Sequence, residues 1–208
     1  MTCVILVRHG QTEWNLAERF RGRADVPLDE IGLAQAEATA RRIAAEWQPV
    51  AVYSSPLRRA VKTAEAIARQ LGLQVQTHQG LIDINYGQWQ GLTREEARDR
   101  WPDVFEAWYL KPGTARIPGG ETLSQLRVRA MEAVRELAAR HQGETIVLVG
   151  HTVVNRAILL ETLGLRNNRF WRLRQDTCAI NVFEVDDGGE DFTLVSLNDT
   201  CHLRGLNK

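Results

Sequence analysis

The sequence has no excess of charge of either sign. Its 208 residues include 26 lysines and arginines and 26 aspartates and glutamates, so the formal net charge at pH 7 is zero. Proteins that bind nucleic acids through the phosphate backbone carry a strong basic excess. We therefore expect no nucleic-acid partner.

Long apolar runs and paired cysteines are missing as well. No stretch approaches the roughly 20 apolar residues that span a bilayer, and Arg8 comes too early for a secretory leader. The three cysteines (Cys3, Cys178 and Cys201) are widely separated and form no CxxC pair. This spacing is typical neither of a disulfide scaffold nor of a structural zinc site. We expect a cytoplasmic protein with no membrane partner.

Several motifs for nucleotide, metal and acyl chemistry are also absent. The chain contains no GxxxxGK[ST] loop, no GxGxxG, no HExxH and no GxSxG string. Its acidic residues do not gather in a pattern typical of Mg²⁺ binding. We therefore expect no cofactor and no metal, and a reaction that depends on a side-chain nucleophile.

The hydrophobic pattern alternates between strands and helices. Short, nearly continuous apolar runs predict buried strands over residues 3–7, 50–53 and 145–149. A 3.6-residue period predicts helices between them, and such alternation favours a three-layer α/β/α sandwich with a mostly parallel sheet. We expect one domain over residues 1–208. The remaining expected elements are helices at 30–47, 57–71 and 122–140, a helix that starts at Thr93, a loop at 110–120, and a terminal strand pair at 179–185 and 192–197 that adds an antiparallel edge.

Basic side chains and histidines follow the three predicted parallel strands. Arg8 and His9 come after the first strand, Arg58 and Arg59 after the second, and His151 after the third. Ligands of open α/β sheets bind at the carboxyl ends of strands, so these residues converge at one edge. Each cation in such a cluster raises the free-energy cost of keeping the others charged, unless an anion is bound. The pattern therefore predicts an anionic ligand, and arginine's planar fork suits phosphate.

His9 is the candidate nucleophile for a phosphoryl group. Neutral imidazole can attack phosphorus and divide one displacement into two steps through a phosphohistidine. Its other ring nitrogen must be held by an acceptor, so that the attacking nitrogen carries the lone pair. Arg8, Arg59 and His151 would neutralise the oxygens of the transferring group.

Four segments resemble motifs of the histidine phosphatase superfamily, the phosphoglycerate mutase-like proteins. Residues 6–15 read LVRHGQTEWN and resemble that family's L-V-R-H-G-x-T-x-x-N string. Residues 55–64, 118–122 and 149–151 are similar to its S-x-L-x-R-A-x-x-T-A segment, its P-G-G-E-[ST] turn and its second histidine. The resemblance extends from residue 4 to at least residue 163, and it implies the phosphoglycerate mutase-like fold.

The resemblance also implies roles for individual residues. His9 would be phosphorylated, Arg8, Arg59 and His151 would complete the phosphate pocket, and Asn15 would add a hydrogen bond. The family's acid is a Glu in an L-x-E-x-x-x-G-x-W-x-G string. Residues 81–91 match this string, with Asp83 at the acid position. Aspartate is one methylene shorter, so this loop must sit closer to the site or a water must relay the proton.

The resemblance favours hydrolysis over the mutase reaction, because the Asn-Lys pair of the mutase loop is absent after Gly91. Among phosphatases, Thr152 and the ending NDTCHL at 198–203 resemble metal-independent phosphoserine phosphatases, in which the tail helps to hold the amino acid. His202 and Leu203 would inherit that role. Tyr86 stands where that subgroup has a histidine, and it could still donate a hydrogen bond to a carboxylate.

We therefore expect a metal-independent phosphomonoesterase whose partner is a small phosphorylated metabolite, with L-phosphoserine as the leading substrate. An α-ribazole or sugar phosphate substrate, a phosphoglycerate mutase and a non-catalytic binding module are the alternatives. A local positive excess at residues 8–23 also leads us to expect substrate contacts from Arg21 and Gly22. The sequence does not decide the oligomeric state. Phe170 and Trp171 suggest an exposed patch that would suit a homodimer.

Overall fold

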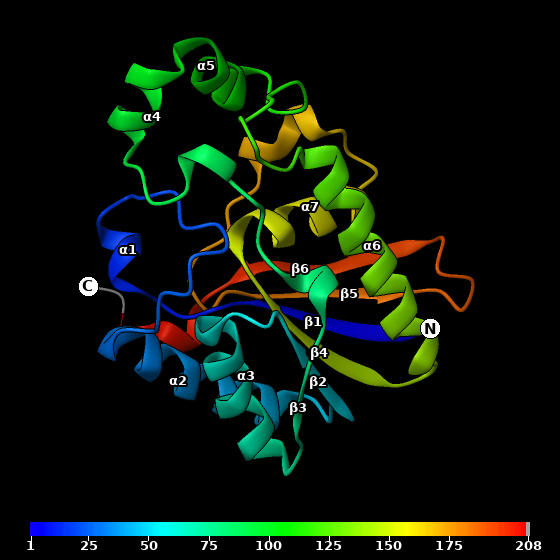
Figure 1. Cartoon of the computed structure of the whole chain (residues 1–208). Coiled ribbons are helices and arrows are strands. Elements are labelled where there is room, and N and C mark those ends of the chain that lie inside the picture. The colour runs from blue at the N-terminus through cyan, green and yellow to red at the C-terminus, as the bar shows by residue number, and fades with distance from the viewer. Residues whose placement is uncertain (207–208) are drawn as a thin grey trace.

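The computed structural model describes residues 1–206, which include a single six-stranded sheet of order β3–β2–β4–β1–β5–β6 (Figure 1). Strands β1, β2, β3 and β4 pair in parallel, whereas β5 and β6 add an antiparallel edge beside β1. The predicted mostly parallel sheet with an antiparallel edge is confirmed. The strands are β1 (Thr2–Arg8), β2 (Ala51–Ser54), β3 (Val75–Thr77), β4 (Thr145–Gly150), β5 (Ile180–Val185) and β6 (Phe192–Asp199).

Helices cover both faces of the sheet, which confirms the predicted sandwich. Helices α2 (Glu30–Glu46) and α3 (Arg58–Leu71) pack against one face, and α6 (Leu123–Arg140) and α7 (Thr152–Thr162) pack against the other. Figure 1 shows α4 and α5 beyond the second layer. The remaining helices are α1 (Glu13–Leu16), α4 (Arg94–Arg100), α5 (Pro102–Leu110) and four short 3₁₀ segments at Gln79–Leu81, Gly87–Trp89, Asn167–Arg172 and Cys201–Leu203.

The strand sequences account for the two layers. Successive side chains of a strand point to opposite faces, so Val4 and Leu6 join the α6–α7 side, whereas Ile5 and Val7 join the α2–α3 side. All four side chains are fully buried. A strand with two buried faces needs an unbroken apolar run, which is the pattern that the sequence carries.

Local signals fix where the helices begin. The Thr122 side chain accepts a hydrogen bond from the backbone of Gln125, whose side chain accepts in turn from the Thr122 backbone, and this capping box starts α6. Thr93 and Glu96 form the same box at α4, as predicted. Helices α5 and α7, the short α1 and strand β3 were not predicted. Within residues 1–206, no helix is both long and apolar enough to cross a bilayer.

The topology brings three strand ends together. Strand β4 lies between β1 and β2, all three run in the same direction, and their carboxyl ends lead into His9, Ser55 and His151. The chain after β1 passes very close to α2. A Cβ on Gly10 would lie 2.4 Å from the carbonyl oxygen of Gly32, so no larger residue fits there without a backbone shift. This close approach fixes the segment that carries His9.

Candidate active site

His9 is held in the tautomer that a nucleophile needs. Its Nδ1 lies 2.6 Å from the carbonyl oxygen of Gly10, and a carbonyl only accepts, so Nδ1 carries the proton. Nε2 therefore has the free lone pair, and it has no hydrogen-bond partner among the residues that the structure describes. Burial and the nearby Arg59 charge hold the pKa of His9 well below its ordinary value. The ring is thus neutral at pH 7 and able to attack.

His151 lies beside His9, with 5.1 Å between the ring centroids. Arg59 donates from Nε to Nδ1 of His151 at 3.2 Å, so the His151 proton is on Nε2, which donates to the Ser55 hydroxyl at 2.7 Å. Burial and Arg59 also hold the pKa of His151 well below its ordinary value. Ser55 received no role in the sequence analysis. In the structure it fixes the orientation of His151.

Two arginines lie at the same strand ends. Arg59, in the first turn of α3, is fully buried and donates to the carbonyl oxygens of Ala24 at 2.7 Å and Gly22 at 2.8 Å. Its neighbour Arg58 points outward to Asp25. Of the two arginines that the strand argument left open, the structure thus places Arg59 in the cluster.

Burial makes the positive charges of the cluster costly. It lowers the pKa of Arg8 to about 9 and that of Arg59 to about 10. Arg8 donates from Nη1 to the carbonyl oxygen of Gln175 at 2.6 Å, whereas its buried Nε has no partner within residues 1–206. An anion bound here would offset the repulsion among the cations. The local electrostatics favour a phosphoryl group.

Asp83 is the carboxylate that faces these cations. Its side chain accepts from the backbone of Ile84 at 2.9 Å, and its other oxygen lies 3.7 Å from Nη2 of Arg59. Burial raises the pKa of Asp83 and outweighs the opposing effect of Arg59. A buried carboxyl group with a raised pKa is suited to act as a general acid.

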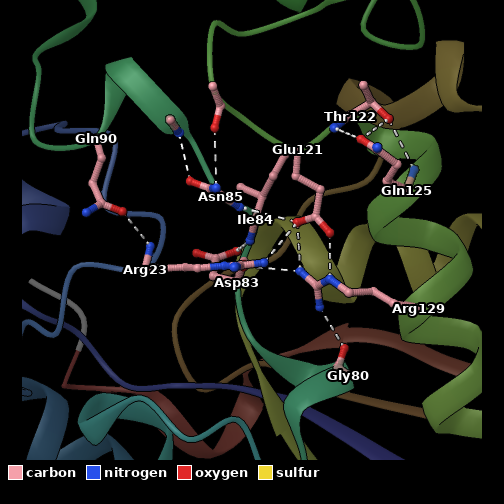
Figure 2. Close-up of polar contacts among 12 residues, drawn as sticks. Arg23, Gly80, Asp83, Ile84, Asn85, Gln90, Glu121, Thr122, Gln125 and Arg129 are labelled. Atoms are coloured by element: carbon pink, nitrogen blue, oxygen red, sulfur yellow. Dashed lines mark hydrogen bonds and ion pairs between the residues drawn. The ribbon is translucent and has the colours of Figure 1, made fainter.

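A clamp holds the loop that carries Asp83 (Figure 2). Arg129 of α6 donates to both carboxylate oxygens of Glu121, at 2.6 and 2.9 Å. The same guanidinium donates to the carbonyl oxygens of Gly80 at 2.9 Å and Asp83 at 3.1 Å. Glu121 also accepts from the backbone of Asn85 at 3.3 Å. Glu121 lies within the P-G-G-E-[ST] turn, so this motif positions the loop of the candidate acid.

A cavity of about 260 Å³ opens in front of the cluster. His9, Arg59 and His151 are fully buried, and lining residues adjoin each of them: Arg8 beside His9, Gly22 bonded to Arg59, and Thr152 after His151. Gly22 has φ of +49°, a conformation that favours glycine. The predicted site residues that line the cavity are Arg8, Asn15, Arg21, Gly22, Asp83, Tyr86 and Thr152.

Tyr86 and Asn15 contribute to the cavity in different ways. Burial raises the pKa of Tyr86, so its phenol stays protonated and can donate. Asn15 accepts from the Thr12 backbone at 2.9 Å and from its hydroxyl at 2.8 Å, and this capping box starts α1. The carboxamide oxygen of Asn15 is thus engaged in local structure, which leaves its amide group for a ligand.

The described part of the C-terminal tail, residues 198–206, does not line the cavity. Leu203 is fully buried with Ala38 and Cys178, and His202 makes a 3.0 Å contact from Nε2 to the Thr39 hydroxyl of α2. Neither residue is part of the cavity lining that the described residues form. In this arrangement His202 and Leu203 contact α2. The expected amino acid contacts therefore have no geometric support.

The expected patch at the 3₁₀ segment Asn167–Arg172 is wrong in part. Phe170 is fully buried, whereas Trp171 is 37 % exposed. Phe170 turns inward because it packs edge-on against Trp171 and closely against Trp108. A single partly exposed tryptophan does not make an apolar dimer surface.

Sequence reasoning missed four residues of the site: Ser55, Glu121, Arg129 and Arg156. Ser55 and Glu121 stood inside motifs that were recognised but given no role. Arg156 follows Thr152 by four residues, the spacing that puts two side chains on one helix face, and both line the cavity. That signal required a helix at 152–162, which was not predicted. Arg129 lies on a predicted helix and carried no signal of its own.

Comparison with known proteins agrees with this geometry. The family model described as histidine phosphatase superfamily (branch 1) matches residues 4–200. The chain belongs to the histidine phosphatase superfamily. The resemblance found in the sequence is confirmed, and so is the phosphatase class that it implied.

Two curated relatives and one solved structure are similar over nearly the whole chain. Phosphoserine phosphatase 1 of Hydrogenobacter thermophilus is 35 % identical, over 98 % of this chain and 95 % of the relative. A metal-independent phosphoserine phosphatase of Arabidopsis thaliana is 41 % identical, over 99 % of this chain and 85 % of its own. A mutant phosphoserine phosphatase of Entamoeba histolytica, solved in complex with phosphoserine, superposes with a TM-score of 0.86 at 28 % identity, covering 98 % of this chain and 100 % of that one.

Proposed function

We propose that this protein is a metal-independent phosphomonoesterase that acts through a phosphohistidine on a small metabolite, with L-phosphoserine as its leading substrate. The observation that carries the proposal is the state of His9. The ring is neutral, its Nδ1 proton is fixed on Gly10, and its free Nε2 lies among Arg8, Arg59 and His151. A binding module would need the arginines but not this tautomer.

The first step transfers the phosphoryl group to the protein. Nε2 of His9 attacks phosphorus, and the bond to the leaving oxygen breaks. Asp83 gives its proton to that oxygen, which leaves as an alcohol. Arg8 and Arg59 stabilise the charge on the three phosphoryl oxygens, and His151 donates to them by turning its Nε2 proton from Ser55.

The second step returns the enzyme to its starting state. The Asp83 carboxylate accepts a proton from a water molecule, and the resulting hydroxide attacks phosphorus. The bond from phosphorus to Nε2 breaks, and inorganic phosphate leaves. His9 regains its lone pair without gaining a proton, because Nδ1 stays bonded to Gly10. No residue has to cross the site between the two steps.

Three observations support L-phosphoserine over other phosphomonoesters. The two curated relatives described above carry the name phosphoserine phosphatase. The Entamoeba structure, which has a similar fold, holds phosphoserine. The cavity of about 260 Å³ is also small, which suits a compact amino acid ester better than the bulky α-ribazole phosphate.

Phosphate release in the presence of EDTA tests the proposal. We expect the wild-type protein to hydrolyse L-phosphoserine with a higher kcat/KM than 3-phosphoglycerate and α-ribazole phosphate. His9→Ala should abolish turnover. Asp83→Asn, which keeps the shape but loses the acid, should lower kcat for L-phosphoserine by about 10²–10⁴-fold.

Three results would contradict the proposal at different points. No release from any compound in EDTA would refute metal-independent hydrolysis. Equal kcat/KM values for all three compounds would refute the substrate but not the chemistry. Unchanged turnover by Asp83→Asn would remove Asp83 from the mechanism.

We also propose that the protein works in a reducing compartment such as the cytoplasm. Its three cysteines are unpaired, and burial raises the pKa of Cys178 to about 12, so this thiol is unreactive. The homodimer stays a prediction, which sedimentation equilibrium of the purified chain would test.

A further inference from the structure

Arg156 on α7 is a cation of the cavity that the phosphoryl chemistry does not use. It lines the cavity four residues after Thr152, on the same face of the helix. A step of four residues advances about 6 Å along an α-helix. Arg156 therefore lies within α7, about one turn further from His151 than Thr152 does.

Two aromatic rings hold the Arg156 side chain in place. Its guanidinium carbon lies 5.1 Å from the ring centroid of Phe170 and 5.1 Å from that of Trp171. Trp171 is itself fixed, because its indole donates to the carbonyl oxygen of Trp108 at 2.7 Å and its ring stacks on Tyr109. Such stacking orients a guanidinium without using its hydrogen-bond donors.

The donors of Arg156 are not engaged by the protein. Within residues 1–206 its Nε is buried without a hydrogen-bond partner, and no carboxylate lies within ion-pair distance of the guanidinium. Arg21 shares this state of its Nε within residues 1–206, whereas two other cations of the lining are compensated. Arg19 donates to Gly91 and pairs with Glu96, and Arg94 pairs with Glu18.

Arg21 and Arg156 are two cations of one cavity lining, and within residues 1–206 the buried Nε of each has no hydrogen-bond partner. Arg21 faces the phosphoryl end, where its charge lowers the pKa of both His9 and His151. Arg156 lies beside Trp171 and Tyr86 beside Trp108 in the same lining, and the charges of Arg21 and Arg156 both act on Arg8 and on Tyr86. A substrate with a second anion a few bonds from its phosphoryl group would offset both of these charges.

We propose that Arg156 binds the carboxylate of the substrate and so selects phosphomonoesters that carry a carboxylate close to the phosphoryl group. This inference rests on the proposed function and sharpens it. The planar fork of arginine matches a carboxylate in two parallel hydrogen bonds, and the neutral Tyr86 phenol can donate a third. The aromatic rings behind Arg156 exclude water from the pair, which strengthens it.

A substrate pair that differs in one carboxylate tests the inference. L-Phosphoserine and phosphoethanolamine share the phosphate and the ammonium group, and only the first has a carboxylate. We would measure kcat/KM for both, and for 3-phosphoglycerate, with the wild-type chain, Arg156→Met, Arg156→Lys and the control Arg172→Met. Arg172 is an exposed arginine of the neighbouring 3₁₀ segment that does not line the cavity.

We expect Arg156→Met to lower kcat/KM for L-phosphoserine and 3-phosphoglycerate by roughly 10- to 100-fold, mainly through KM, and to affect phosphoethanolamine much less. Arg156→Lys, which keeps the charge without the fork, should fall between. Arg172→Met should match the wild type. An equal loss for all three substrates, or no loss, would overturn the inference.

Binding separates this inference from the proposed function. Calorimetric titration of the same compounds does not require turnover. If no compound is hydrolysed but L-phosphoserine and 3-phosphoglycerate bind in an Arg156-dependent way, the proposed function fails and the carboxylate site stands. If the wild-type chain hydrolyses phosphoethanolamine as well as L-phosphoserine, the phosphatase stands and the carboxylate site fails.

Discussion

Replacing Glu121 by glutamine should displace Asp83, the proposed general acid, without changing Asp83 itself. Glu121 is the carboxylate of the clamp, its side chain is 12 % exposed, and that of its partner Arg129 is 22 % exposed. Glutamine keeps the shape but leaves Arg129 without a counter-charge. Breaking a fully buried ion pair costs about 3–5 kcal/mol. We expect Glu121→Gln to lower the free energy of unfolding by about 1–3 kcal/mol, because Arg129 is partly solvated and keeps its hydrogen bonds to Gly80 and Asp83.

The kinetic effect should depend on the leaving group. Arg129 and Arg23 both donate to the carbonyl oxygen of Asp83, at 3.1 and 3.3 Å, so a loosened clamp displaces the acid. A misplacement of about 1 Å can cost about 10²-fold. We expect kcat for L-phosphoserine to fall by about 10- to 100-fold, because its serine alkoxide is a poor leaving group that needs the proton. Hydrolysis of p-nitrophenyl phosphate should fall much less, because its leaving group needs little acid assistance.

Denaturant unfolding and steady-state kinetics of Glu121→Gln provide the test. Glu161→Gln is the matched control, because Glu161 also pairs with an arginine of α6, Arg127, and is 31 % exposed. The control should lose stability without changing the ratio of the two substrates. If Glu121→Gln lowered kcat equally for both substrates, or left both unchanged, the clamp would not position Asp83.

Two further predictions concern stability. Leu203→Ala should lower the free energy of unfolding by about 2–4 kcal/mol, because Leu203 is fully buried. It should leave the KM for L-phosphoserine unchanged. A raised KM at normal stability would instead indicate that the tail binds the substrate. The folded-state pKa values of His9 and His151 lie below the ordinary value of about 6.5, so the stability due to their neutral forms is present above that pH and is lost as pH falls. At pH 5.5 each histidine should lower the free energy of unfolding by up to about 1.4 kcal/mol. In urea titrations, His9→Asn should therefore lose less of its free energy of unfolding between pH 7 and 5.5 than the wild type does. An equal loss in the two proteins would refute the assigned burial effect.

The parts of the fold with a one-dimensional signal were predictable. The strands β1, β2 and β4 are short apolar runs, and α6 begins at the capping box of Thr122. Strand β3 escaped because its residues are half-buried or exposed and it lacks such a run. Helix α7 escaped because most of its residues are buried, so no polar face marks its period.

The properties of the site also divide into those with a signal in the sequence and those without one. His9 and His151 could be found because each follows a strand, and the sheet topology joins strand ends. The tautomer of His9 could not be predicted, because it depends on where the Gly10 carbonyl points. The packing of the tail could not be predicted for a related reason. A resemblance in residues 198–203 gives their type, whereas the contacts of Leu203 with Ala38 and Cys178 depend on the packing of α2.

One physical cause accounts for the main properties of this site. Burial lowers the pKa of His9, which keeps the proposed nucleophile neutral, and it raises the pKa of Asp83, the proposed acid. The same burial makes the charges of Arg8 and Arg59 unfavourable until an anion arrives, so the affinity for a phosphoryl group comes from the environment that tunes the acid and the nucleophile.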